Sequence, residues 1–159
     1  MPLELVIFVG LQASGKTTFY RCRFAATHVH VSKDNFRNNP RPARRQEQLV
    51  TRALSEGRSV VVDNTNVRTD DRRQLIELGK RFGAVVIAYQ FTAALDGCLE
   101  RNRQRTGKAR VADRGVAATS RVFAPPAPEE GYDAMYRVAL GTNDAFDVAP
   151  TWPPDTPAR

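Results

Sequence analysis

Apolar residues gather in short runs along the chain, and these runs predict the strands of a sheet. Residues 5–9 and 60–63 are almost continuously apolar, as expected of strands covered on both faces. Residues 28–32 alternate between polar and apolar side chains, and residues 84–91 form another apolar run. Residues 136–140 predict a last strand, so the pattern indicates a sheet of about five strands.

Amphipathic stretches separate these runs and predict helices. Apolar spacing, together with glycine and proline stop signals, places the helices over residues 16–26, 43–56, 70–81, 93–103 and 111–123. Alternating strands and helices are typical of an α/β fold, in which a parallel sheet has helices on both faces. Ligands of such folds bind at the carboxyl ends of the strands.

Proline changes the pattern toward the C-terminus. Residues 125–128 read Pro-Pro-Ala-Pro and predict an extended connection before the last strand. Residues 150–159 are rich in proline and lack periodicity, which predicts an irregular tail. We therefore expect one domain over residues 1–149, long enough to enclose a single core.

The loop after the first predicted strand carries the strongest motif. Residues 10–17 read Gly-Leu-Gln-Ala-Ser-Gly-Lys-Thr, a complete G-x-x-x-x-G-K-T phosphate loop between a buried strand and a helix. Its glycines let backbone N–H groups point at phosphates, its lysine reaches the outer phosphates, and its threonine hydroxyl is placed for Mg²⁺. We expect ATP and Mg²⁺ here, rather than an ordinary glycine turn. The predicted nucleotide-binding residues are Gly10, Leu11, Gln12, Ala13, Ser14, Gly15, Lys16, Thr17 and Thr18, of which Thr17 is also a predicted metal ligand.

An acidic and a basic residue follow the second predicted strand. Asp34 and Arg37 therefore come to the sheet edge that carries the phosphate loop. A kinase that phosphorylates an alcohol needs a carboxylate to orient the attacking hydroxyl and accept its proton, a role for which Asp34 is the candidate. Arg37 is placed to hold a phosphate of the acceptor in two hydrogen bonds. The alternative for Asp34 is a turn or helix-capping side chain.

Polar residues also follow the third predicted strand. Asp63 ends a strand that resembles a Walker B strand, whose terminal carboxylate approaches the Mg²⁺ shell. Asp63 is thus a candidate to contact the metal, its water shell or a basic residue of the site. Asn66, slightly further on, is a candidate substrate-binding residue. The alternative is that both residues simply suit a turn.

An arginine-rich segment lies between the last two predicted helices. Arg101 and Arg105 are four residues apart and would share one face of a helix, with Gly107 as a hinge just beyond them. Such a segment can close over the triphosphate and offset the charge of the reacting oxygens. We therefore expect Arg101 and Arg105 to be catalytic, together with Lys16 and Asp34. The alternative is a solvated basic helix end.

The charge balance adds a candidate partner. The chain has 24 basic and 17 acidic residues, a formal net charge of +7, and most of the excess is arginine, which favours bidentate phosphate contacts. This balance fits a nucleic-acid or other polyanionic partner, although a basic surface without a specific partner is the alternative.

Compartment signals are few. Cys22 and Cys98 are the only cysteines, lie in no metal-ligand or C-x-x-C pattern, and are expected to be reduced core thiols. The first apolar run is too short for a signal-peptide core, and no stretch reaches membrane-spanning length. We therefore expect a cytoplasmic protein with no membrane partner.

With these motifs in place, the chain resembles the 5′-hydroxyl polynucleotide kinase family of P-loop phosphotransferases. The arginine-rich segment is the most discriminating part of the resemblance. The match rests on residues 10–17, 32–37, 62–66 and 101–108 within a span of about 3–140.

The resemblance implies roles for the candidate residues. Asp34 would be the general base for the 5′-hydroxyl, and Arg37 would hold the phosphate that adjoins the terminal nucleoside. Arg101 and Arg105 would belong to a mobile lid. The resemblance also implies a P-loop kinase fold, ATP as the phosphate donor, Mg²⁺ as the cofactor, and a 5′-OH end of DNA or RNA as the acceptor.

The phosphate loop departs from this family in one place. The family commonly has Pro-Gly where this chain has Gln12 and Ala13, so a position that often tolerates positive φ carries a Cβ here. We expect a difference in loop shape or nucleotide preference. Many family members are fused to a phosphatase or ligase, whereas this chain lacks the D-x-D phosphatase motif and is expected to be a stand-alone kinase.

Three functions stay open at this point. The leading interpretation is transfer of the γ-phosphate of ATP to the 5′-OH end of DNA or RNA. The second is a P-loop kinase of a small molecule or a tRNA-linked substrate, and the third is an ATP-binding regulatory module without transfer. A GTPase is disfavoured, because no N/T-K-x-D motif follows the fourth predicted strand.

Overall fold

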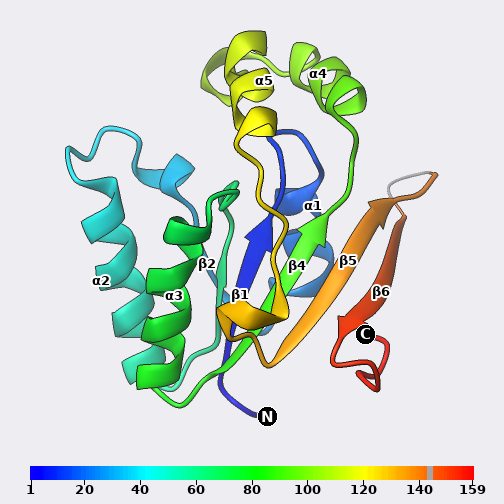
Figure 1. Ribbon diagram of the computed structural model, residues 1–159. Coiled ribbons are helices and arrows are strands. Elements are labelled where there is room, and N and C mark those ends of the chain that lie inside the picture. The colour runs from blue at the N-terminus through cyan, green and yellow to red at the C-terminus, as the bar shows by residue number, and fades with distance from the viewer. Residues whose placement is uncertain (143–144) are drawn as a thin grey trace.

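The computed structural model describes residues 1–142 and 145–159, and over these residues the strands form one six-stranded sheet (Figure 1). The strand order is β2-β3-β1-β4-β5-β6. The first five strands run parallel, and β6 is antiparallel to β5 at the edge. The α/β fold predicted from the sequence is thereby confirmed. The strands are β1 (Glu4–Val9), β2 (Val29–Val31), β3 (Val60–Val62), β4 (Val85–Phe91), β5 (Ala134–Leu140) and β6 (Phe146–Trp152).

Helices cover both faces of the sheet, with α2 and α3 side by side on one face and α1 on the other (Figure 1). Alternate residues of β1 explain these two layers. Leu5 packs in a core cluster with residues of α2 and α3, whereas Phe8 packs in a second cluster with Phe19 of α1. The helices are α1 (Lys16–Arg23), α2 (Pro42–Ser55), α3 (Thr69–Arg81), α4 (Leu95–Arg103) and α5 (Asp113–Arg121), and the 3₁₀ turns are η1 (Lys33–Phe36), η2 (Gly107–Ala109) and η3 (Pro128–Glu130).

Strand β6 was not predicted, and it extends into the segment expected to be an irregular tail. Phe146 and Val148 are partly covered, while Asp147 and Ala149 are exposed, which is the alternation of a half-buried strand. Pro150 pairs with Tyr136 in this strand. Proline is tolerated there because an edge strand pairs on one side only.

The cysteines differ from one another. Cys98 is buried, as expected, but Cys22 is exposed near the end of α1, so the expectation of two core thiols was wrong for Cys22. The helix presents its buried face through Phe19, and Cys22 falls outside that face. Within the described residues, no helix is long and apolar enough to cross a membrane.

A buried ion cluster links the start of β1 to the residue before β2 and to the C-terminal residue. The Glu4 carboxylate, which is 4% exposed, contacts His28 Nε2 at 2.9 Å and accepts a hydrogen bond from Arg159 Nη2 at 2.7 Å. Burial raises the pKa of Glu4, but the hydrogen bonds from His28 and Arg159 outweigh burial and lower the pKa to about 2. The cluster therefore stabilises the fold only while Glu4 is ionised.

We expect this cluster to make the protein acid-sensitive. The pKa of Glu4 is lower in the folded than in the unfolded chain, so its contribution is present above about pH 4.5 and is lost as the pH falls toward 2. Glu4→Gln should reduce the free energy of unfolding by about 2 kcal/mol at neutral pH and flatten its acid dependence. Urea unfolding followed by circular dichroism at several pH values measures both effects. Exposed Glu129→Gln is the control, and equal acid dependence of wild type and Glu4→Gln would refute the assignment.

Candidate active site

The phosphate loop joins β1 to α1 and takes a conformation that only some residues adopt easily. Gly15 has φ 95°, and a Cβ on Gly10 would lie 2.8 Å from the Cβ of Phe91. The Gly10 N–H donates to the Thr65 carbonyl oxygen at 2.9 Å, which fixes the loop to the segment after β3. The loop therefore lies at the carboxyl edge of the sheet, as predicted.

Ala13 takes a left-handed backbone conformation although it carries a Cβ. Ala13 has φ 59°, a conformation that costs a residue with a Cβ about 1–2 kcal/mol. Gln12 Nε2 donates to Thr119 Oγ1 of α5 at 3.0 Å, so the loop is linked to the last helix. Where the resembled family commonly has a glycine, which adopts this conformation without strain, this chain has Ala13 and a side-chain hydrogen bond from the neighbouring Gln12.

Lys16 is buried among the carbonyl groups of its own loop. Its Nζ donates to the Gly10 carbonyl at 3.0 Å and to the Leu11 carbonyl at 2.6 Å. Burial lowers the pKa of Lys16 to about 8, although the nearby carboxylate of Asp63 acts in the opposite direction. The amine is therefore charged at neutral pH and loses its charge in mildly alkaline solution.

We expect nucleotide affinity to follow this titration. Bound phosphates favour the charged amine, so the dissociation constant of ATP should rise by up to about tenfold per pH unit above about pH 8. Isothermal titration calorimetry between neutral and alkaline pH measures this slope. Lys16→Met is the matched control, because it should bind ATP weakly with no such slope. Parallel pH profiles of the two proteins would exclude Lys16 as the titrating group.

Thr17 and Asp63 lie together where a metal is expected. The Thr17 hydroxyl donates to Asp63 Oδ2 at 2.8 Å, and Asp63 is 4% exposed. Mg²⁺ is held by one or two carboxylates together with hydroxyl, water and phosphate oxygens, so this donor pair fits it. Within the described residues, no group of three or more His, Cys, Asp or Glu side chains is placed to hold a metal.

His30 is a site residue that the sequence did not indicate. Its Nε2 lies 2.8 Å from Asp63 Oδ2, the same oxygen that Thr17 contacts, and its ring stacks on Tyr20 with the centroids 4.2 Å apart. The ring therefore fixes the orientation of the carboxylate. In the sequence, His30 is notable only for its place in the second predicted strand. This place indicates a site residue only when β2 is known to pair with β3, the strand that Asp63 follows.

The turn after β2 brings Asp34 and Arg37 to the same edge. Asn64 Oδ1 accepts a hydrogen bond from the Lys33 N–H at 2.9 Å, and Ser32 Oγ accepts one from the Asp34 N–H at 3.3 Å. Arg37 Nη2 lies 3.1 Å from Asp34 Oδ1. The turn is thus fixed by side chains on both sides, and it presents the carboxylate and the guanidinium together.

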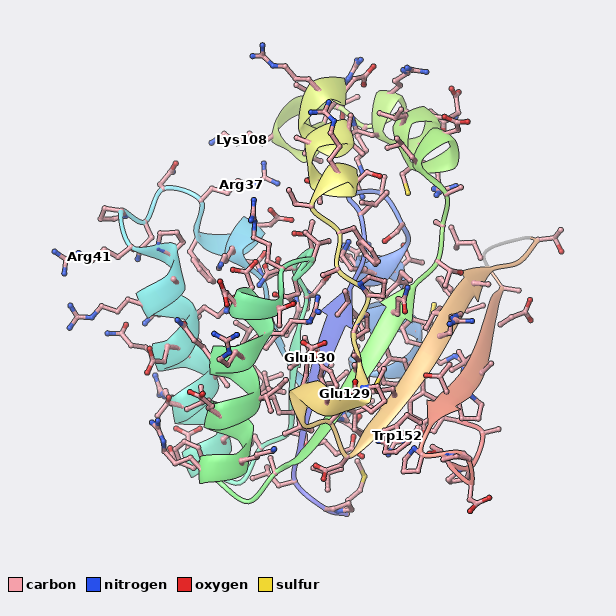
Figure 2. The ribbon with its side chains drawn as sticks, viewed as in Figure 1. Arg37, Arg41, Lys108, Glu129, Glu130 and Trp152 are labelled. Carbon is pink, nitrogen blue, oxygen red and sulfur yellow. The ribbon has the colours of Figure 1, made fainter. Side chains whose placement is uncertain are left out.

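Arg37 also reaches the arginine-rich segment. Its Nη1 donates to the Lys108 carbonyl oxygen, and Figure 2 shows the two residues next to one another. Gly107 has φ 60° in the turn η2, a conformation that favours glycine. The segment before α5 therefore faces the turn that carries Asp34.

Arg101 and Arg105 do not share one face, contrary to the expectation from their spacing. Helix α4 ends at Arg103, so Arg105 lies beyond the helix and helical spacing does not relate the two side chains. Arg101 Nε donates to the Ala13 carbonyl oxygen at 2.7 Å and so contacts the backbone of the phosphate loop. Arg105, in contrast, lines the cavity. The two arginines thus occupy different places around the loop.

Asn66 is held by the backbone around it. It is 4% exposed, has φ 46°, and its Nδ2 donates to the Phe8 carbonyl oxygen at 2.8 Å. Its own carbonyl accepts a hydrogen bond from Arg72 Nη1 at 2.9 Å. The residue lines the cavity, and acceptor binding by its side chain stays a prediction.

One cavity of about 280 Å³ gathers most of the predicted residues. Of the other loop residues, Leu11 and Ser14 are buried and Thr18 is exposed on the first turn of α1. The arrangement can bind phosphates and hold a divalent metal, and it has a further carboxylate, Asp34, in the same cavity. The lining includes Lys16, Thr17, Asp34, Arg37, Asp63 and Arg105.

The phosphate loop follows the first strand of a mostly parallel sheet, and a threonine–aspartate pair suited to Mg²⁺ and a further carboxylate lie in the same cavity. These features define the P-loop kinase class of fold. The family described as AAA domain (AAA_33) matches residues 5–126, and the chain belongs to it.

Solved structures with this fold include kinases. Kti12 of Chaetomium thermophilum in complex with ADP-AlF3 has a TM-score of 0.73 at 19% identity, covering 88% of this chain and 91% of that one. A fungal RNA kinase has a TM-score of 0.68 at 16% identity, with 91% and 79% covered. A chain of the Pnkp1/Rnl/Hen1 RNA repair complex has a TM-score of 0.65 at 23% identity, with 76% and 44% covered.

A sequence relative adds little about function. Transcription factor bHLH140 of Arabidopsis thaliana is 28% identical over 108 residues, which is 65% of this chain. The match spans 12% of the length of that protein. It therefore concerns a domain-sized part of a much longer chain.

Proposed function

We propose that this P-loop kinase domain transfers the γ-phosphate of ATP to the 5′-hydroxyl of a DNA or RNA end. The observation that carries the proposal is the shared cavity, which Asp34 and Arg37 line together with Lys16 and Thr17. A carboxylate beside a phosphate loop suits an alcohol acceptor, and a guanidinium beside that carboxylate suits an acceptor that carries its own phosphate.

The proposed transfer uses the residues as follows. Lys16 binds the outer phosphates of ATP, and Asp34 takes the proton of the 5′-hydroxyl as its oxygen attacks the γ-phosphorus. The bond from this phosphorus to the β–γ bridging oxygen breaks, and ADP leaves. Mg²⁺ bound beside Thr17 and Asp63 supplies charge neutralisation on the phosphates. Arg105, which lines the same cavity, offsets the charge on the transferred group.

The acceptor phosphate is assigned to Arg37. Arg37→Ala should raise the KM for a 5′-OH oligonucleotide about 10–100-fold and leave the KM for ATP unchanged, because hydrogen bonds to a charged group contribute about 1.5–3 kcal/mol. Initial rates at varied acceptor and ATP concentrations separate the two constants. Exposed Arg21→Ala removes the same charge from α1 and should change neither. An unchanged acceptor KM in Arg37→Ala would reject the assignment.

A kinase of a small or tRNA-linked acceptor is the second candidate. The observation that favours it is the cavity volume of about 280 Å³, at the lower end of small-ligand pockets. Gluconokinase and sugar kinase structures also share the fold, at 17% and 19% identity and TM-scores of 0.60 and 0.65.

An acceptor panel separates the candidates. ATP, Mg²⁺ and the protein are incubated with 5′-OH oligonucleotides, nucleosides or sugars, and ADP release is measured for each. The proposal expects oligonucleotides to give the highest kcat/KM, whereas preference for a nucleoside or sugar supports the second candidate. Tight ATP binding without transfer to any acceptor supports a regulatory module.

A further inference from the structure

An exposed strip of arginines leads away from the mouth of the cavity. Residues 35–46 contain four arginines and no acidic residue. In Figure 2, Arg37, just after η1, lies beside Lys108, and Arg41, just before α2, extends outward from the molecule. All four side chains are exposed. We call Arg37, Arg41, Arg44 and Arg45 the arginine strip.

In the described part of the chain, the three arginines of the strip at the start of α2 have no acidic partner, unlike Arg52 further along this helix. Further along the same helix, Arg52 Nε lies 3.2 Å from Glu56 Oε1. Within the described residues, Arg41, Arg44 and Arg45 form no ion pair. Neighbouring like charges repel one another, and a polyanion that binds across them removes this repulsion.

The strip faces solvent and is continuous with the site. Arg41 and Arg45 are four residues apart across the start of α2, and they lie opposite the buried Val50. Arg37 at the other end pairs with Asp34. The strip therefore begins at the cavity, which Arg37 lines, and continues to the exposed start of α2.

We propose that the arginine strip binds the phosphates that follow the 5′ end of the acceptor. This inference rests on the proposed function and extends it beyond the terminal nucleotide. A cavity of about 280 Å³ has no room for the rest of a polynucleotide, so that part must lie outside. Guanidinium groups bind phosphodiesters in bidentate fashion and read no sequence, so the strip favours long acceptors of any sequence.

Binding tests the strip directly. A 5′-OH single-stranded DNA of about twelve nucleotides with a fluorophore at its 3′ end is titrated with protein at several salt concentrations. Arg41→Ala/Arg45→Ala should bind about tenfold more weakly at low salt, and the slope of log K against log salt should decrease by about 1.4. Arg21→Ala/Arg23→Ala removes equal charge from the far end of α1 and should match wild type. Wild-type affinity and slope in Arg41→Ala/Arg45→Ala would overturn the proposal.

Kinetics separates this inference from the proposed function. In Arg41→Ala/Arg45→Ala the KM for a 5′-OH dinucleotide should stay at the wild-type value, and the KM for the longer DNA should rise about tenfold. Equal KM changes for both acceptors would overturn the strip and leave the transfer reaction standing. Weakened DNA binding in a protein that phosphorylates no oligonucleotide would reject the reaction and leave the strip as a polynucleotide-binding surface.

Discussion

Replacing Asp34 with asparagine should lower kcat for phosphoryl transfer by about 10²–10⁴-fold, the usual contribution of a general base. Asparagine fills the same space and accepts hydrogen bonds but cannot take up the proton of the acceptor hydroxyl. The dissociation constant of ATP should stay close to that of wild type, because the groups proposed to hold the phosphates are Lys16 and the loop backbone, not Asp34. Single-turnover transfer and calorimetric ATP binding measure the two quantities.

A matched control shows whether the loss is specific. Asp147→Asn makes the same chemical change on the exposed face of β6 and should transfer at the wild-type rate. Wild-type transfer in Asp34→Asn would remove Asp34 from the role of base. A parallel loss of ATP binding would instead indicate that Asp34 supports the nucleotide site.

The second large effect is expected on stability, at Arg72. This side chain is fully buried and pairs with Glu130 in two hydrogen bonds of 2.7 and 3.0 Å. Its Nη1 also donates to the carbonyl oxygens of Asn66 and Ala124. Arg72→Ala leaves the mostly buried Glu130 carboxylate, whose side chain is 11% exposed, and two carbonyl groups without this partner. We expect the free energy of unfolding to fall by about 3–5 kcal/mol.

Such a loss is a large part of the about 5–15 kcal/mol that stabilises a typical domain. Urea unfolding measures it, and Arg73→Ala is the control on the same helix. Arg73 pairs with Asp70 at 3.0 Å in an exposed position, so its removal should cost at most about 1 kcal/mol. If Arg72→Ala does not fold, Arg72→Lys is the variant to measure. It keeps the charge but cannot form the bidentate pair with Glu130, and it should still be clearly destabilised. Unfolding of Arg72→Lys at wild-type urea concentrations would refute the account.

Local patterns made the strands and the phosphate loop predictable. Strand β1 is buried on both faces. Its continuous apolar run at residues 5–9 predicts this, because a strand covered by helices on both faces needs apolar side chains on both faces. Gly10 and Gly15 also stand where the loop needs them. Strand β6 was missed because Pro150 usually excludes a strand, and only the sheet edge makes it acceptable.

Pairings between distant residues could not be predicted in the same way. Arg72 and Glu130 are 58 positions apart, and either residue alone has the appearance of an ordinary surface charge. His30 becomes a site residue only because β2 pairs with β3 and turns its ring toward Asp63. The end of α4 at Arg103 was predicted correctly, but the contact of Arg101 with the Ala13 carbonyl, 88 positions away, was not.

The position of the transferred phosphate shows whether the protein phosphorylates 5′-hydroxyl ends. The protein is incubated with γ-labelled ATP, Mg²⁺ and 5′-OH DNA or RNA, and the label is located by nuclease digestion, with the same oligonucleotides carrying a 5′-phosphate as the control. We expect label on the 5′-terminal nucleotide of the 5′-OH oligonucleotides, none on the phosphorylated ones, and little with Asp34→Asn. Absence of label from every 5′-OH end, while ATP is bound and a small acceptor is phosphorylated, would contradict the proposed function.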